Sequence, residues 1–256
     1  GKLYSTDKLG EKNEEMSIAK YTQALQGFLQ IEPNSKKIKP YIQYRIGKMF
    51  CYGLGTEQDY QKAFEWFERS AKQKNKFAQF SLANLYYYGS GIEKDLSQAF
   101  LWYQRASSQG QPYAAYSIAQ MYRYGEYVTK DNDTAQRYYQ QALSAFLKIE
   151  SDDMANDDLF YKLGQMFKLG LGTDSDVTKA IEYFRCSAEM NNKNGLFEYG
   201  KALLTGEHLE QDIERDKEKA VEWFTKSAND GNEYAQDLLE NMERYENACL
   251  LYTSPS

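Results

Sequence analysis

Few side chains in this chain have the chemistry of a catalytic or metal-binding group. His208 is the only histidine among the 256 residues, and it lies in a polar segment ahead of Asp216. A solvated loop position suits it better than the role of a general base. A zinc site takes several His or Cys ligands, and the three cysteines are far apart in the sequence. We therefore expect no catalytic residue, no metal ion and no cofactor.

Two short segments resemble ligand-binding loops only in part. Residues 173–176 read Thr-Asp-Ser-Asp, but the glycine and the final glutamate of a calcium loop do not follow. Gly53 and Gly55 lack the further glycines and the lysine of a phosphate-binding loop, and they follow a helical pattern where such a loop follows a strand. Asp176 is better explained as a helix cap, and we expect no bound nucleotide.

The composition argues against two classes of partner. The formal net charge is −6, whereas affinity for nucleic acid comes mostly from Lys and Arg. A local basic strip is still compatible with this net charge. No apolar run approaches the roughly 20 residues that span a bilayer. Cys51 and Cys186 fall in different repeats, which is typical of free thiols in a reducing compartment. We expect a cytoplasmic protein that neither binds nucleic acid directly nor enters a membrane.

The strongest signal is a ladder of small residues at nearly constant spacing. The steps are 36, 36, 45 and 36 residues, and each small residue has a large apolar residue three places on and a glycine six places on. A helical face repeats every three or four residues, and glycine accepts the left-handed conformation that ends a helix. Each ladder residue therefore marks one amphipathic helix. The ladder consists of Gly47, Ala83, Ala119, Gly164 and Gly200.

A second block follows each ladder helix in register. It opens with an aspartate, has an alanine four places on, and then an aromatic pair. The aspartate can accept hydrogen bonds from the free amides that open a helix. The sequence thus predicts an all-α chain, an α-solenoid of about eleven or twelve antiparallel helices without a sheet. The aspartates are Asp59, Asp95, Asp131, Asp176 and Asp216.

Part of the array is duplicated as a block, because Gly47 and Gly164 lie 117 positions apart in matching surroundings. The long helices predicted around 24–32 and 142–150 also match each other.

The chain divides into three parts on this pattern. Residues 1–40 form a partial repeat with a long helix and a linker, and residues 41–247 form a solenoid of about five repeats plus a terminal helix. The last segment, 248–256, differs, because residues 249–256 match one reading frame of a sequencing adapter. We expect this segment to be a scar, and the chain to be cut at both ends.

The repeat pattern resembles the Sel-1-like repeat, a member of the tetratricopeptide superfamily. The resemblance covers about residues 41–247 and implies a right-handed superhelix of helix pairs that acts as a noncatalytic adaptor for other proteins. Some secreted members carry a cysteine pair in each repeat, which this chain lacks. The motif in the second repeat reads Ala78-x-x-x-Leu82-Ala83-x-x-Tyr86-x-x-Gly89-x-Gly91-Ile92-x-x-Asp95-x-x-x-Ala99-x-x-Trp102-Tyr103.

Two segments are also similar to the repeat tails of mobilisation relaxases from Gram-positive bacteria. They run from Tyr44 to Thr56 and from Tyr161 to Thr173. Those enzymes nick DNA through a separate N-terminal domain, and no residue here carries that chemistry.

One side of the first helices is predicted to line the concave wall of the solenoid. Each residue advances about 100° around a helix, so positions three before and one, four and five after each ladder residue face away from the second helix. These twenty positions, called the stripe below, hold four basic and no acidic residues. The candidate partner-binding residues are Tyr44, Lys48, Tyr52, Phe80, Asn84, Tyr88, Tyr116, Gln120, Arg123, Tyr124, Tyr161, Gln165, Lys168, Phe197 and Lys201.

Each row of the stripe has a structural alternative. The aromatic residues three places before the ladder could pack one first helix on the next. The residues one place after the ladder are long donors suited to the carbonyls of an extended peptide, or they have no role. They are Lys48, Asn84, Gln120, Gln165 and Lys201.

The sequence therefore favours a noncatalytic scaffold, monomeric in isolation, that binds a protein or an extended, acidic peptide on its concave face. The alternative is the repeat arm of a larger DNA-mobilisation enzyme whose catalytic domain is missing from this chain.

Overall fold

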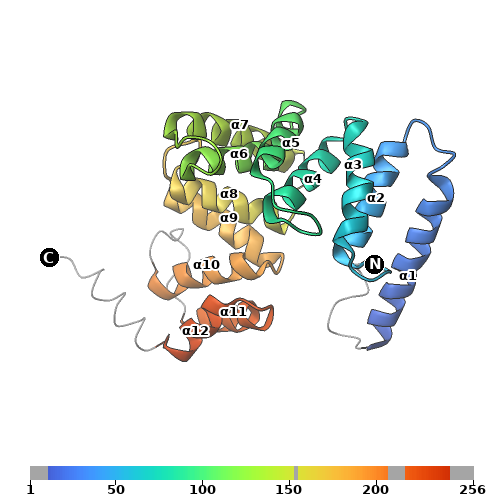
Figure 1. The fold of residues 1–256 in the computed structure, drawn as a ribbon. Helices are drawn as coiled ribbons and strands as arrows, with labels where there is room; N and C mark the ends of the chain where they lie inside the picture. Colours follow the sequence, from blue (N-terminus) through green and yellow to red (C-terminus); the bar gives the residue numbers. More distant parts are fainter. Residues whose placement is uncertain (1–10, 153–154, 207–216, 243–256) are drawn as a thin grey trace. The chain divides into compact units, whose positions relative to one another are not determined.

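The computed structural model describes residues 11–152, 155–206 and 217–242, and these residues form twelve α-helices and no strand (Figure 1). The prediction of an all-helical repeat chain is confirmed. The expectations for His208, Asp216 and residues 248–256 lie outside the described residues. The helices are α1 (Glu11–Ile31), α2 (Lys39–Tyr52), α3 (Tyr60–Lys72), α4 (Lys76–Tyr88), α5 (Leu96–Ser108), α6 (Pro112–Tyr124), α7 (Asn132–Ser151), α8 (Asp157–Leu169), α9 (Val177–Glu189), α10 (Lys193–Thr205), α11 (Lys217–Asn229) and α12 (Glu233–Glu240).

Both ends of the first turn in each repeat are set by the predicted residue types. The glycine six places after the ladder residue ends the first helix in the left-handed conformation; Gly89, for example, has φ 69° and donates its N–H to the Leu85 carbonyl. The next helix begins at the aspartate: Asp95 Oδ1 accepts a hydrogen bond from the Gln98 N–H at 2.9 Å. Equivalent caps form at Asp59, Asp131 and Asp176.

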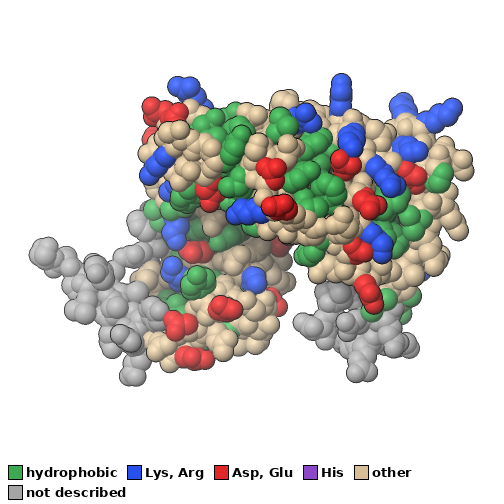
Figure 2. All heavy atoms as spheres, in the orientation of Figure 1, with side chains coloured by type: hydrophobic (Ala, Val, Ile, Leu, Met, Phe, Trp, Pro, Cys, Tyr) green, Lys and Arg blue, Asp and Glu red, His purple; other side chains and the backbone are tan. Residues whose placement is uncertain are grey.

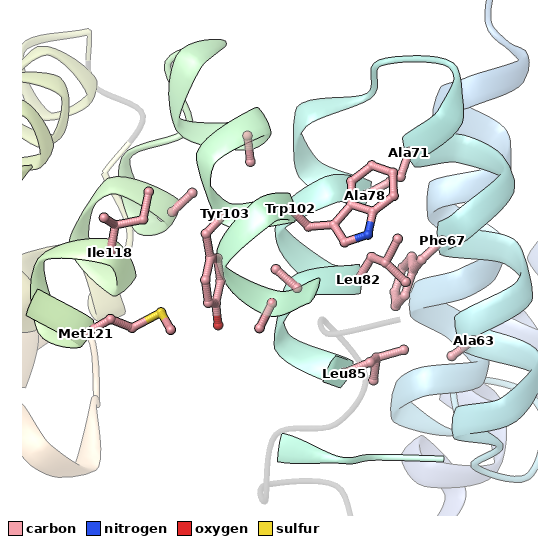
Figure 3. Packing of buried hydrophobic residues seen from close by; sticks show 14 residues of the cluster. Ala63, Phe67, Ala71, Ala78, Leu82, Leu85, Trp102, Tyr103, Ile118 and Met121 are labelled. Atoms are coloured by element: carbon pink, nitrogen blue, oxygen red, sulfur yellow. The ribbon is translucent and has the colours of Figure 1, made fainter. Parts of the chain in front are cut away.

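The ladder residues are small because an aromatic ring of the second helix lies directly on them. A Cβ added to Gly47 would stand 2.6 Å from the Phe67 ring, and one added to Gly200 would stand 2.8 Å from the Phe224 ring. The aromatic pairs are therefore core residues. Figure 3 shows how such rings and the alanines between them fill the space between successive helices.

A second glycine in three of the turns brings consecutive repeats together. Gly91 has φ 72°, and a Cβ there would lie 2.7 Å from the Tyr60 carbonyl carbon, at the start of the preceding repeat's second helix. Gly55 and Gly172 make the same backbone approach. Tyr127 occupies this place in the third repeat and keeps a positive φ of 65°.

The chain forms two compact units, Gly1–Tyr138 and Tyr139–Ser256, and the boundary falls within α7. Unit 1 contains 19 Lys and Arg against 14 Asp and Glu, whereas unit 2 contains 12 against 23. The net charge of −6 thus conceals a positive unit and a strongly negative one. The expectation that the chain does not bind nucleic acid directly stays a prediction.

Candidate functional site

The most exposed part of the stripe is a row of apolar side chains at the ends of the first helices. Tyr52, Tyr88 and Tyr124 are the last residues of α2, α4 and α6, and their exposed fractions are 63%, 71% and 63%. Leu169, at the end of α8, is 55% exposed. Figure 2 shows exposed hydrophobic side chains lying between Lys and Arg on the face it presents. Such side chains are available for contact with a partner, and tyrosine offers a large contact area at low entropic cost.

The aromatic row three places before the ladder residues packs within the fold. In unit 1 the Tyr44 ring centroid lies 5.8 Å from that of Phe77, and the Phe80 centroid lies 6.0 Å from that of Tyr113. These contacts join the first helices of consecutive repeats. Tyr116 is buried, at 7% exposure.

In unit 2, Phe197 makes the same kind of contact with Tyr234, at 6.3 Å, and Tyr161 lies 5.9 Å from Phe184. The packing alternative therefore describes this row better than ligand contact.

The row of long donors is half-buried and partly engaged inside the protein. Asn84 Oδ1 accepts a hydrogen bond from the Tyr103 hydroxyl at 2.7 Å, and Gln165 Nε2 donates to the Tyr161 oxygen at 2.8 Å. Lys48 Nζ lies 5.6 Å from the centre of the Tyr52 ring. Gln120 is half-buried at the same place in α6. The structure thus gives Asn84 and Gln165 a role in the fold.

Carboxylates from outside the stripe reach its basic residues, which corrects the expectation of an acid-free surface. In unit 2, Glu198 Oε2 lies 2.6 Å from Lys168 Nζ and 3.9 Å from Lys201 Nζ. In unit 1, the Tyr87 hydroxyl donates to Glu126. Arg123 stacks on Tyr124, with 5.7 Å between the guanidinium carbon and the ring centre. Glu198 therefore offsets part of the positive charge that the stripe carries in unit 2.

Burial and these carboxylates also raise the pKa values of two tyrosines in the stripe. Burial, followed by the hydrogen bond to Glu126, raises the pKa of Tyr87 to about 12. Burial and then the charges of Glu198 and Asp158 raise the pKa of Tyr161 to about 12. Both phenols are therefore neutral hydrogen-bonding groups at physiological pH.

Sequence reasoning missed Glu126 and Glu198 for different reasons. Glu198 precedes Lys201 by three positions on α10, so the helical i,i+3 rule could have indicated that pair. The contact with Lys168 crosses from α10 to α8 and needs the fold. Glu126 follows the helix-ending glycine of α6 yet bonds to Tyr87 of α4, and no local pattern indicates it.

The described residues offer few groups for metal or thiol chemistry. Among them, no three His, Cys, Asp or Glu side chains gather at one place. Cys51 and Cys186 are half-buried and free, and burial raises the pKa of both thiols. Within the described part of the chain, no helix is both long and apolar enough to cross a bilayer.

The geometry above is that of a repeated helix pair, and the known family of such repeats covers most of the chain. The Sel1 repeat matches five consecutive segments, 40–75, 76–111, 112–145, 161–192 and 194–232. The chain belongs to the Sel1 repeat family. Sel1 repeats generally mediate protein–protein interaction and are typically noncatalytic scaffolds.

Solved Sel1 repeat proteins have the same fold. The crystal structure of a Sel1 repeat protein from Oxalobacter formigenes is similar with a TM-score of 0.59 and 28% sequence identity, over 88% of this chain and 85% of that one. A putative Sel1 repeat protein from Klebsiella pneumoniae matches with a TM-score of 0.51 and 20% identity, over 89% and 99% of the two chains. No curated protein sequence matches significantly. The similarity to relaxase tails stays a prediction.

Proposed function

We propose that this Sel1 repeat protein is a noncatalytic scaffold and that unit 1 binds an extended segment of a partner protein along the stripe. The observation that carries the proposal is the row of exposed Tyr52, Tyr88 and Tyr124, spaced by one repeat and flanked by Lys48 and Arg123. Aromatic surfaces beside cations suit a segment that has both apolar side chains and carboxylates.

The same positions in unit 2 support binding less well. Leu169 and Thr205 replace the tyrosines, and Glu198 pairs with Lys168 and approaches Lys201. A carboxylate of the partner would compete there with a carboxylate of the protein itself. We therefore assign recognition of an acidic segment to the stripe of unit 1.

A selection of displayed peptides on the purified protein tests the proposal. We expect the selected peptides to lose about 1–2 kcal/mol of binding free energy with Tyr88→Ala or Tyr124→Ala, since exposed aromatic anchors dominate such interfaces. The double variant Lys48→Glu, Arg123→Glu should weaken acidic peptides by a similar amount.

The matched control is Lys168→Glu, Lys201→Glu, which changes the net charge equally but in unit 2. It should leave the affinity unchanged. Equal losses from both double variants would show a response to overall charge, and unchanged binding in all variants would remove the stripe as the site. Circular dichroism of each variant checks that helicity is retained.

A further inference from the structure

Three turns of unit 1, each joining a second helix to the next first helix, lie side by side along one edge. Ser70 Oγ donates to the Pro40 carbonyl at 2.5 Å, and Lys76 Nζ lies 3.5 Å from the Gly110 carbonyl oxygen. These contacts tie each turn to the next. The surface is called the basic edge below and comprises residues 32–39, 69–76 and 105–112.

The two edges of unit 1 differ sharply in charge. The basic edge holds eight basic residues and one acidic residue, Glu32. The opposite turns, residues 53–60, 89–96 and 125–132, are equally long and hold six acidic residues and two lysines. The basic residues are Lys36, Lys37, Lys39, Arg69, Lys72, Lys74, Lys76 and Arg105.

Helix electrostatics does not explain this difference. Each turn on either edge joins the C-terminus of one helix to the N-terminus of the next, so the helix dipoles favour neither sign overall. Capping accounts for Asp59, Asp95 and Asp131 on the opposite edge. None of the caps that the structure describes uses a lysine side chain, and Asn75 and Gln111 cap the first helices of the basic edge.

Lys74 lies at a position whose backbone conformation is unfavourable for lysine. Its φ is 65°, in the left-handed region, where a side chain is unfavourable. The equivalent residues after α5, α9 and α11 are Gly110, Asn191 and Gly231, which enter this region more easily. A lysine at this turn thus has a conformational cost that the other repeats avoid, which favours a role for its charge.

Five of the eight basic residues have no carboxylate partner among the described residues, and the other three are paired. Glu32 lies 3.6 Å from Lys39 Nζ, Glu65 lies 3.8 Å from Arg69, and Glu68 lies 2.8 Å from Lys72. The two arginines are held on indole rings, Arg69 on Trp66 at 4.8 Å and Arg105 on Trp102 at 4.4 Å. The unpaired residues are Lys36, Lys37, Lys74, Lys76 and Arg105.

We propose that the basic edge of unit 1 is a second binding surface and that it takes an acidic segment of a partner protein. Neighbouring helices pack about 8–10 Å apart, so three turns match an extended peptide of about eight residues. A peptide can place neutral residues opposite Glu32, Glu65 and Glu68, whereas a nucleic acid has a phosphate on every nucleotide and would meet these carboxylates. The stacked arginines offer their planar forks to carboxylates.

Fluorescence anisotropy with the full chain tests this, using a labelled peptide of about eight residues in which glutamate and serine alternate and a single-stranded DNA of similar length. We expect the peptide to bind and to weaken about tenfold with Lys36→Glu, Lys37→Glu. The control Lys94→Glu, Lys130→Glu lowers the net charge equally on the opposite edge and should keep the affinity. Equal losses in both variants, or tighter binding of DNA than of peptide, would overturn the proposal.

The variant Lys74→Gly distinguishes an effect on binding from an effect on folding, because we expect it to stabilise the fold and to weaken the binding of the peptide. It should raise the melting temperature by relieving the left-handed lysine and at the same time weaken the peptide about twofold or more. Unchanged peptide affinity in this variant would contradict the role of Lys74. Loss of binding in Lys48→Glu, Arg123→Glu, with none in Lys36→Glu, Lys37→Glu, would place the peptide on the stripe and end the proposal for the edge.

Discussion

At the scale of single residues, the left-handed glycines do two different tasks. Gly89 only ends a helix, and a Cβ there would find its nearest neighbour, in Lys94, at 3.1 Å. Gly91 also brings the turn against the backbone of Tyr60 in the preceding repeat. Gly110 has a positive φ and open space around it. A side chain at Gly110 would therefore have only the conformational cost of a positive φ, whereas a side chain at Gly91 would also have the cost of a steric clash.

Alanine substitutions should therefore destabilise the protein more at Gly91 than at Gly110. We expect Gly110→Ala to lower the free energy of unfolding by about 1 kcal/mol, from the left-handed conformation alone. Gly91→Ala should lower it by about 3 kcal/mol, because its Cβ also overlaps the Tyr60 backbone. Urea denaturation measures both values. Equal effects would mean that the repeats separate without cost at this contact.

The raised pKa of Tyr87 predicts that the free energy of unfolding depends on pH in the alkaline range. Its pKa is raised to about 12 in the folded protein, against about 10 in an unfolded chain. Its contribution to stability is therefore complete below pH 10 and is lost as the pH rises from about 10 through 12. Tyr87→Phe should lose less stability across this range than the wild type. Parallel curves of unfolding free energy against pH would show that burial and the Glu126 contact do not raise the pKa of Tyr87.

At the scale of helices, local chemistry predicted most boundaries. The aspartate and glycine positions indicated where second helices begin and first helices end, because caps and left-handed turns depend on a few neighbouring residues. Asn75 and Asn192 as caps of first helices follow the same logic. By contrast, Lys74 and Tyr127 in left-handed conformations break the residue preference and were not predictable.

The cap at α5 can be tested alone. Asp95→Ala removes the acceptor for the Gln98 N–H and should destabilise the protein by about 1 kcal/mol. Asp95→Asn keeps an acceptor oxygen and should cost much less. A thermal melt of the three proteins distinguishes a cap from a mere surface charge, since in the latter case asparagine and alanine would behave alike.

At the scale of the molecule, the sequence predicted the solenoid but not the charge of its surfaces. A repeat pattern is visible in one dimension, so the fold class followed directly. The stripe was predicted from isolated helices, and the contact of Glu198 with Lys168, between the first helices of two neighbouring repeats, lowers its positive charge in unit 2. The split in net charge needed the boundary after Tyr138, which only spatial contacts reveal.

In a repeat array, a destabilising substitution should mainly affect the repeats next to it. Because each repeat contacts mainly its neighbours, the effect of Gly91→Ala should decay along the chain. Hydrogen exchange should rise in α3–α6 and stay close to wild type in α9 and α10. A uniform rise across all helices would indicate instead that the whole chain opens as one cooperative unit.

The paired glycines of three turns have a consequence for heredity. Gly55, Gly91 and Gly172 lie so close to the preceding repeat that a Cβ on any of them would meet main-chain atoms there. Unequal crossing-over between two copies would thus join repeats that never met before and still produce a fitting junction. Genes of this kind can gain or lose whole repeats in one event, so the length of the array can evolve separately from the residues that bind partners.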